Sequence, residues 1–197
     1  MPAFAPGTLP ERLSGFTPGG GAWPVAGPDA VPPAKRPSAV CLLFVPPPAG
    51  EKSALVVLTR RSVTVKSHRG QIGLAGGRAE PDDASPAATA LRELEEELGL
   101  ARSRVRVAGL LAAVAALDGS PVIPVIGFAA TTIADLKPSA AEVAYAFAVP
   151  WTSFRKEAAQ AFRFNIFGRW RTTQSFQAGA ENVWGLTALI LHAADLA

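Results

Sequence analysis

The stretch "SPAATALRELEEELGL", residues 85–100, carries the clearest folding signal in the chain. Ser85 is a preferred N-cap, Pro86 suits the first turn of a helix, and Gly99 suits the left-handed residue that follows a helix. The sequence therefore predicts an α-helix over residues 86–98. Its leucines recur at helical spacing, so one stripe of the helix is apolar and can pack on a sheet.

A second face of this helix is acidic. At about 100° per residue, Glu93, Glu96 and Glu97 share one narrow face, whereas Glu95 points away from it. Like charges at these spacings repel one another by a few tenths of a kcal/mol per pair. Two explanations stay open: a site for a hard divalent cation such as Mg²⁺ or Mn²⁺, or a solvated acidic face, which is the commoner fate of such a helix.

The helix follows a glycine-rich segment, "GQIGLAGGRAEPDDAS", residues 70–85. Glycines let a backbone approach a ligand closely and expose a carbonyl to it. The segment is not a P-loop, because no Gly-Lys-Ser/Thr follows, and it lacks the dinucleotide-binding spacing.

Upstream, "TRRSVTVKSHRG" supplies side chains that can meet phosphate oxygens, namely Arg60, Arg61, Lys66, His68 and Arg69. Positively charged side chains on one side and carboxylates on the other suit a phosphate that is bridged to the protein through a metal. The plainer explanation of the upstream residues is an exposed basic loop.

Apolar, β-branched runs bounded by turn residues predict strands elsewhere in the chain. They span residues 38–45, 53–61, 105–114, 120–130 and 142–151, with weaker candidates at 161–167 and 172–177. Helical spacing of apolar residues predicts a second helix over 183–194. Strands on both sides of the first helix favour a mixed α/β or α+β sandwich over a strictly alternating parallel sheet.

Length and composition restrict the class of protein. At 197 residues, we expect one domain, starting near residue 37 after a Pro-, Gly- and Ala-rich extension over residues 1–36. The net charge of +3 is too small to indicate nucleic-acid binding, and no apolar run approaches the ~18 residues of a membrane span. The lone Cys41 and the absence of a secretory signal predict a cytoplasmic protein, with Cys41 buried in a strand. The oligomeric state is left open, a homodimer included.

Residues 77–100 resemble the Nudix box, which reads Gly, five residues, Glu, seven residues, Arg-Glu, an aliphatic residue, any residue, Glu-Glu, any residue, Gly and an aliphatic residue. The matching positions are Gly77, Arg92, Glu93, Leu94, Glu96, Glu97, Gly99 and Leu100. Asp83 stands where the first Glu is usual, with eight rather than seven residues before Arg92. The resemblance implies an α/β fold, a Nudix-type α/β/α sandwich with a mixed β-sheet over residues 37–197. It also implies hydrolysis of a diphosphate linkage in a nucleoside diphosphate derivative.

Within that superfamily the chain resembles the coenzyme A diphosphatases. The motifs "LTRRS" (58–62), "HRGQ" (68–71), "DAS" (83–85) and "TALRE" (89–93) follow the subgroup's pattern, whereas Leu74-Ala75 replaces its usual Phe-Pro. The likeness implies that coenzyme A or a derivative is split into 3′,5′-ADP and 4′-phosphopantetheine. Two alternatives stay open: a Nudix hydrolase of ADP-ribose, a dinucleotide or a nucleoside triphosphate, and a non-catalytic Nudix-fold nucleotide-binding module.

The resemblance also implies a metal site. One or more Mg²⁺ or Mn²⁺ ions would neutralise the diphosphate and activate the attacking water. The expected ligands are Glu93, Glu96, Glu97 and the carbonyl of Gly76.

Further roles follow from the same likeness. Arg92, Glu96 and Glu97 form the predicted catalytic group, and Arg92 is also expected to hold the loop against the helix through Asp83. Gly77 and Gly99 are expected to be structural positions of the box.

Arg61, His68 and Gln71 are expected to contact the substrate, since they match the upstream motif. The plain alternative is that Arg61 pairs with a carboxylate and His68 caps a turn.

The general base is left open. Glu96 is one candidate, and Glu142 is another, although a surface carboxylate at a strand start explains Glu142 better. His192 and Trp184 are expected to pack rather than to bind a ligand.

Overall fold

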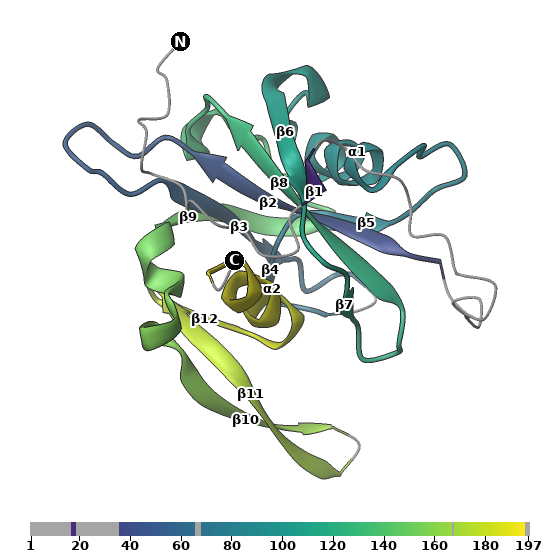
Figure 1. Cartoon of the computed structure of the whole chain (residues 1–197), viewed down its shortest axis with the longest axis vertical. Helices are drawn as coiled ribbons and strands as arrows, with labels where there is room; N and C mark the ends of the chain where they lie inside the picture. The colour runs from purple at the N-terminus through teal and green to yellow at the C-terminus, as the bar shows by residue number, and fades with distance from the viewer. Residues whose placement is uncertain (1–16, 19–35, 66–67, 167, 196–197) are drawn as a thin grey trace.

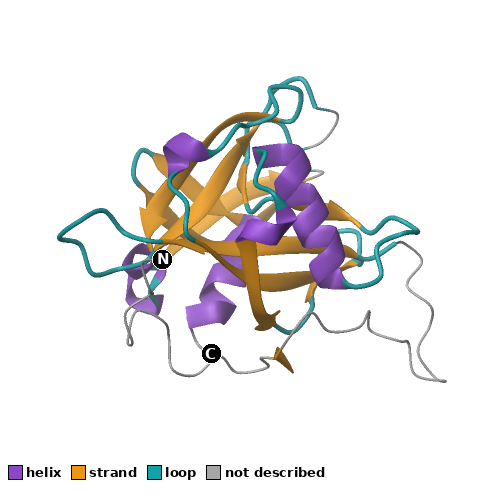
Figure 2. Ribbon diagram, turned by 90° about the horizontal axis from the view of Figure 1, so that it is seen from above, coloured by secondary structure: helices purple, strands orange, loops and turns teal. Residues whose placement is uncertain are grey.

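The computed structural model describes residues 17–18, 36–65, 68–166 and 168–195. The predicted extension over residues 1–36 lies almost wholly outside these ranges, so its boundary stays a prediction. Helix α1 (Pro86–Leu98) packs on one face of a mixed sheet, and helix α2 (Gly185–Asp195) packs on the other, as Figures 1 and 2 show. The predicted α/β/α sandwich is confirmed.

In the described residues, nine strands form the main sheet. They are β1 (Thr17–Pro18), β2 (Ser38–Val45), β3 (Leu55–Arg61), β4 (Ile72–Gly73), β5 (Gly76–Arg78), β6 (Val105–Leu110), β7 (Val114–Ala115), β8 (Pro121–Ala129) and β9 (Val143–Pro150). A smaller sheet contains β10 (Gln160–Ile166), β11 (Arg169–Ala178) and β12 (Glu181–Trp184). Short 3₁₀ helices join several strands: η1 (Arg102–Arg104), η2 (Ile133–Asp135), η3 (Trp151–Phe154) and η4 (Lys156–Ala158).

Strand β2 lies at the centre of the main sheet. It runs parallel to β8 and antiparallel to β3 and β5. Its side chains alternate between two hydrophobic cores: Cys41 and Leu43 face α1, whereas Leu42 and Phe44 face α2. Burial on both faces explains why the predicted strand reads as a continuous apolar run.

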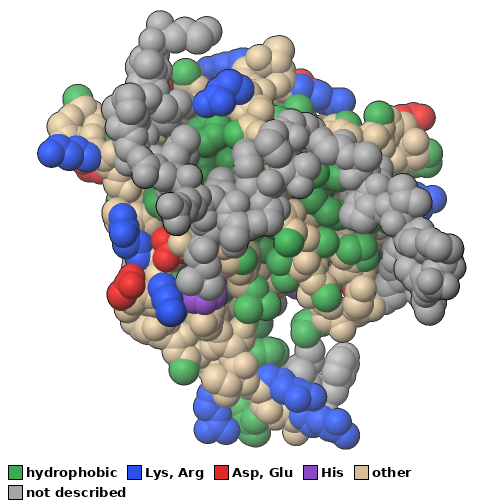
Figure 3. Space-filling view, in the orientation of Figure 1, with side chains coloured by type: hydrophobic (Ala, Val, Ile, Leu, Met, Phe, Trp, Pro, Cys, Tyr) green, Lys and Arg blue, Asp and Glu red, His purple; other side chains and the backbone are tan. Residues whose placement is uncertain are grey.

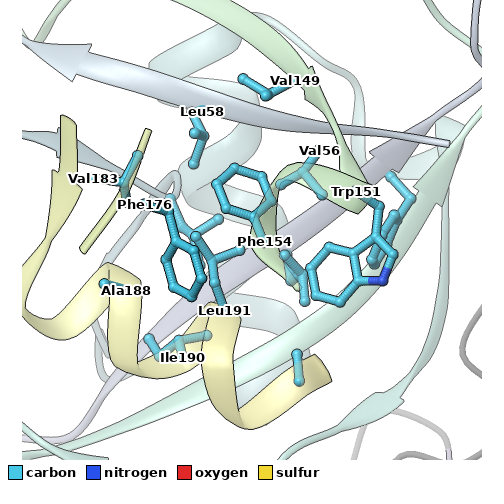
Figure 4. Close-up of a cluster of buried hydrophobic side chains, with 14 of the residues drawn as sticks. Val56, Leu58, Val149, Trp151, Phe154, Phe176, Val183, Ala188, Ile190 and Leu191 are labelled. Carbon is cyan, nitrogen blue, oxygen red and sulfur yellow. The ribbon is translucent and has the colours of Figure 1, made fainter. Parts of the chain in front are cut away.

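The core on the α2 side is rich in aromatic rings. Figure 4 shows Phe154 and Phe176 beside Leu191 of α2, with Trp151 next to Phe154. The Phe154 and Phe176 rings meet edge to face with centroids 5.7 Å apart, a favoured aromatic geometry. This core ties the small sheet and α2 to the main sheet.

Two predicted boundaries were wrong. The second helix starts at Gly185 rather than residue 183, because Val183 and Trp184 belong to β12 and Gly185 turns the chain with φ of 67°. The strand predicted over 105–114 is interrupted: β6 ends at Leu110 and β7 begins at Val114. Both weaker strand candidates are confirmed as parts of β10 and β11.

The β10–β11 hairpin projects from the sandwich at the end opposite α1 (Figure 1), and Figure 3 shows Lys and Arg side chains gathered there. Arg163, Arg169 and Arg171 are exposed on it, and the Arg163 guanidinium lies 5.3 Å from the centroid of the exposed Trp170 ring.

Among the described residues, no helix is long and apolar enough to cross a membrane.

Gly76 sets how closely β5 approaches β2. Its φ of 155° is rarely adopted by other residues, and a Cβ there would collide with the Ala39 carbonyl and with Val40. This close approach fixes the glycine-rich segment over residues 70–85, called the glycine loop below, against the sheet at Gly76.

Replacing Gly76 by alanine should lower the free energy of unfolding by about 3 kcal/mol, through strain and steric overlap together. Gly119 is the matched control, because its φ is also positive, at 81°, yet no described atom lies within 4 Å of its Cβ position. Gly119→Ala should cost about 1 kcal/mol. Urea denaturation measures both, and equal losses would contradict the steric explanation.

Candidate functional site

A buried ion pair joins the glycine loop to α1. Arg92 Nη2 lies 3.0 Å from Asp83 Oδ2 and also donates to the Arg78 carbonyl at 3.0 Å. Asp83 further accepts hydrogen bonds from the Glu80 N–H and the Thr89 hydroxyl. The contact expected between Asp83 and Arg92 is therefore present, although an aspartate replaces the usual glutamate.

The start of α1 is fixed locally. The Ser85 hydroxyl accepts the Ala88 N–H at 3.1 Å, and Gly99 ends the helix with φ of 64°. Both caps and both helix ends match the sequence prediction. They set the rotation of the helix, and so the direction of every carboxylate on it.

Arg92 also contacts two carboxylates of the acidic face. Its Nη1 lies 2.9 Å from Glu93 Oε1 and 2.9 Å from Glu96 Oε2. Burial opposes ionisation of Asp83, but the hydrogen bonds from Arg92, Glu80 and Thr89 lower its pKa overall. The hydrogen bond to Asp83 also raises the Arg92 pKa, so the guanidinium stays charged.

Glu93 and Glu97 face the glycine loop. The Glu93 carboxylate lies so close to Gly77 that a Cβ at Gly77 would overlap it. The Glu97 side chain is only 2% exposed; its Oε2 accepts the Gly76 N–H at 3.3 Å, and its Oε1 lies 3.4 Å from Arg61 Nη1. The glycines are thus needed where the two carboxylates meet the loop.

Arg92 and Arg61 compensate these two carboxylates only in part. Burial, with repulsion from Glu93 and Glu142, raises the pKa of Glu97 to about 7, although Arg61 lowers it. Burial also raises the pKa of Glu93, with repulsion from Glu96 and Glu142 adding to it. Oxygen donors that repel one another are a donor set that a hard cation favours.

The predicted ligands are not all equivalent. Glu96 is 52% exposed and contacts Arg92, Glu93 contacts both Arg92 and the loop, and Glu97 contacts the loop. No three His, Cys, Asp or Glu side chains within residues 36–65, 68–166 and 168–195 already form a metal-holding cluster. The ligand set of Glu93, Glu96, Glu97 and the Gly76 carbonyl therefore stays a prediction.

Glu142, at the start of β9, was expected to be a plain surface carboxylate. It is exposed, but it lies close enough to raise the pKa of both Glu93 and Glu97. The Ser62 N–H donates to its carbonyl and so attaches the β9 end to the end of β3. The structure brings this fourth carboxylate to the site from outside the box.

Arg61, His68 and Gln71 make the contacts of the plain alternative. Arg61 pairs with Glu97, and the exposed His68 Nδ1 lies 2.9 Å from Gln71 Oε1. His68 has a positive φ of 56°, and its carbonyl accepts the Gln71 N–H within the turn. The substrate contacts of all three remain a prediction, and Lys66 lies outside the described residues.

A second charged cluster supports that turn. Glu181 Oε1 and Oε2 lie 2.8 and 2.7 Å from Arg60 Nη1, and the Tyr145 hydroxyl also donates to Glu181. Arg60 Nη2 is 3.8 Å from the Cβ position of Gly70, which precedes Gln71. Sequence reasoning missed Glu181 and Tyr145, because Glu181 lies 121 residues from Arg60 and no local pattern joins them.

Three other expectations concern packing. Trp184 is half-buried between Phe162 and Phe164, with ring centroids 5.1 and 5.3 Å away, and His192 is half-buried on α2, as expected. Cys41 is 1% exposed, and burial raises its pKa to about 12, so it is the expected inert strand residue.

A mixed sheet between two helices, with a glycine loop leading into an acidic helix, defines the class of Nudix-fold proteins. The chain belongs to the Nudix family, because residues 35–167 match the family model described as NUDIX domain. It is a Nudix hydrolase acting on a nucleoside diphosphate derivative, and enzymes of this family generally use divalent metal ions.

Relatives support this assignment. The chain is 37% identical over 142 residues to the uncharacterized Nudix hydrolase NudL of Photorhabdus laumondii, covering 70% of this chain and 73% of the relative. NudL of Yersinia pestis is 36% identical over 142 residues, covering 70% and 69%. The crystal structure of RenU, a Nudix hydrolase from M. smegmatis, has a TM-score of 0.50 at 26% identity, covering 60% of this chain and 72% of that one. A MutT/nudix family protein from Enterococcus faecalis shares the fold, with a TM-score of 0.54 at 15% identity, covering 84% and 63%.

Asp83→Asn should lower the free energy of unfolding by about 3 kcal/mol, because it leaves the buried Arg92 without its main counter-ion. Glu95→Gln is the matched control, since the Glu95–Arg102 pair is 2.8 Å long but about half exposed at both partners. It should cost less than about 1 kcal/mol. Urea unfolding measures both, and an equally mild effect of Asp83→Asn would refute a structural role for the pair.

The raised pKa of Glu97 predicts a pH dependence of stability for the metal-free protein. Between pH 4.5, the ordinary value, and about 7, the folded state holds a proton that the unfolded state has lost. The free energy of unfolding should therefore fall as the pH rises through this window, by roughly 3 kcal/mol in total. Glu97→Gln should remove most of this slope in chemical denaturation with chelator present, and an unchanged slope would contradict the burial of an ionisable group there.

Proposed function

We propose that the chain hydrolyses the diphosphate of coenzyme A or a derivative, giving 3′,5′-ADP and 4′-phosphopantetheine, with Mg²⁺ or Mn²⁺. The observation that supports this most is the contact of Arg61 with Glu97. It joins the upstream "LTRRS" motif, which distinguishes the subgroup, to the acidic helix that all Nudix boxes share. A guanidinium that could bind a substrate phosphate then lies beside an expected metal ligand.

The residues present fit a divalent ion. Glu93 and Glu97 offer carboxylate oxygens beside the glycine loop, Glu96 can complete the set after leaving Arg92, and Gly76 can add its carbonyl. A bound ion would neutralise diphosphate charge and make water a better nucleophile. Arg92 and Asp83 hold α1 against the loop, so that these oxygens could converge on an ion.

Glu97 and Arg61 act together in this proposal. The positive charge of Arg61 lowers the pKa of Glu97, against the effect of burial. With an ion bound by Glu97, Arg61 would be free to donate to a substrate phosphate oxygen. Glu96, which is exposed, and Glu142 both remain candidates to accept the proton of the attacking water.

The departure from Phe-Pro does not weaken the proposal. Leu74 is 8% exposed and Ala75 is 3% exposed, and the Ala75 carbonyl accepts the Cys41 N–H at 2.8 Å. Leu74 and Ala75, in place of Phe-Pro, are therefore packing residues beneath the loop, and the substitution removes no polar group from the proposed site. The buried thiol of Cys41 also suits a reducing compartment such as the cytoplasm.

Rival functions differ in the group beyond the diphosphate. ADP-ribose, dinucleotides and nucleoside triphosphates would use the same carboxylates without the coenzyme A moiety. A binding module without catalysis is less well supported, because Glu93, Glu96 and Glu97 are all retained. A panel of coenzyme A, ADP-ribose, NADH and nucleoside triphosphates, each with Mg²⁺ and with Mn²⁺, separates these cases. The highest kcat/KM should be for coenzyme A, and no preference for it would refute the subgroup assignment.

Glu97→Gln should lower kcat by at least roughly 100-fold with the preferred substrate, a loss of about 3 kcal/mol of transition-state stabilisation. Glu95→Gln is the control on the same helix, because Glu95 faces away from the loop and pairs with Arg102. Its kcat should be unchanged. Steady-state product release followed by chromatography measures both, and full activity of Glu97→Gln in correctly folded protein would exclude Glu97 from the site.

A further inference from the structure

Strand β9 forms an edge of the main sheet. Within the described residues only β3 pairs with it, in register from Leu55–Pro150 to Arg60–Tyr145. The Trp151 N–H donates to the Ala54 carbonyl at 2.9 Å on this ladder. Alternation then directs the main-chain groups of Tyr145 and Phe147 toward β3, and those of Ala144, Ala146 and Ala148 away from it.

The opposite edge of β3 confirms this alternation. The Arg61 N–H donates to the Gln71 carbonyl at 3.0 Å, so odd-numbered residues of β3 bond toward β4 and even-numbered residues bond toward β9. Arg60 accordingly pairs with Tyr145. The three alanines therefore present N–H and C=O groups outward, and no described residue bonds to them there.

Two usual protections of an edge strand, charged side chains and an interior proline, are missing from β9. Residues 143–150 contain no charged side chain, and the strand's one proline, Pro150, stands at its end. Ala144 and Tyr145 are exposed, and Ala146, Phe147 and Ala148 are half-buried. An uncharged edge of this kind is a template for pairing with another strand.

The sequence of this edge is nearly its own mirror. Residues 144–148 read Ala-Tyr-Ala-Phe-Ala, centred on Ala146. Two antiparallel copies related by a two-fold axis would place Ala146 opposite itself and Tyr145 opposite Phe147. We propose that a second copy of this chain pairs along β9 about an axis at Ala146, joining the two main sheets.

The hydrogen-bond alternation fits this register. Ala146 faces outward, so the two copies of it would exchange both main-chain bonds. Tyr145 and Phe147 would then form non-hydrogen-bonded pairs, in which side chains lie closer and aromatic pairs contribute most. Their rings already lie with centroids 6.0 Å apart within one strand. Pro150 would fall opposite Glu142 and end the pairing, because it lacks an N–H.

A self-crosslink tests this axis in the full chain. In the proposed register, the two copies of residue 146 have Cα atoms about 5.5 Å apart, within the range of a disulfide. Ala146→Cys should form a disulfide dimer under mild oxidation. Ala144→Cys is the matched control, because its two copies would lie about 13 Å apart along the strands. The native Cys41 is buried and should not react.

Sedimentation of the unmodified chain over a concentration series is the companion measurement, and it should show a reversible dimer. A disulfide dimer with Ala146→Cys, none with Ala144→Cys, and a wild-type dimer together support the proposal. Crosslinking of both variants alike, a wild-type dimer without the Ala146→Cys crosslink, or a wild-type monomer at every concentration would each overturn it. The last result would leave the edge to a peptide strand of another protein.

Discussion

The buried contact between Arg92 and Asp83 is the interaction on which the site depends. Removing charges from water is unfavourable unless they are paired and hydrogen-bonded, and here the guanidinium meets three carboxylates and a carbonyl. These bonds join the loop before α1 to the middle of the helix. The distance and rotation of the helix relative to the glycine loop are thereby fixed, and with them the positions of Glu93 and Glu97.

The same arrangement pairs the carboxylates with cations unequally. Arg92 compensates Asp83, Glu93 and Glu96, whereas the cation that contacts Glu97 among the described residues is Arg61, at the longer distance of 3.4 Å. Burial and neighbouring carboxylates therefore raise the pKa of Glu97 toward neutrality. Perturbed carboxylates of this kind are more frequent at functional sites, and a cation bound in the proposed metal site would relieve their repulsion.

The sequence could predict features that depend on residues close together along the chain. The ends of α1 follow from Ser85, Pro86 and Gly99, which act within a few residues of the helix. The contact between Arg61 and Glu97, 36 residues apart, depends on how β3 lies beside α1, and sequence spacing does not contain that. Glu142 is the exposed carboxylate that was expected, but its influence on Glu93 and Glu97 could not be predicted for the same reason, because the pairing of β9 with β3 brings it near them. The second helix was also predicted to start too early, within β12. Val183 and Trp184 are apolar and fit the helical spacing, although they pack from a strand.

In the proposed metal site, the glycine loop and one turn of α1 hold a divalent ion between Glu93, Glu97 and the glycines. Anomalous diffraction from crystals of the protein grown with Mn²⁺ tests it most directly, because the signal locates the ion without assuming its ligands. We expect a peak within about 2.3 Å of carboxylate oxygens of Glu93 and Glu97, beside Gly76. A peak elsewhere in the molecule, with these carboxylates still bound only to protein groups, would contradict it.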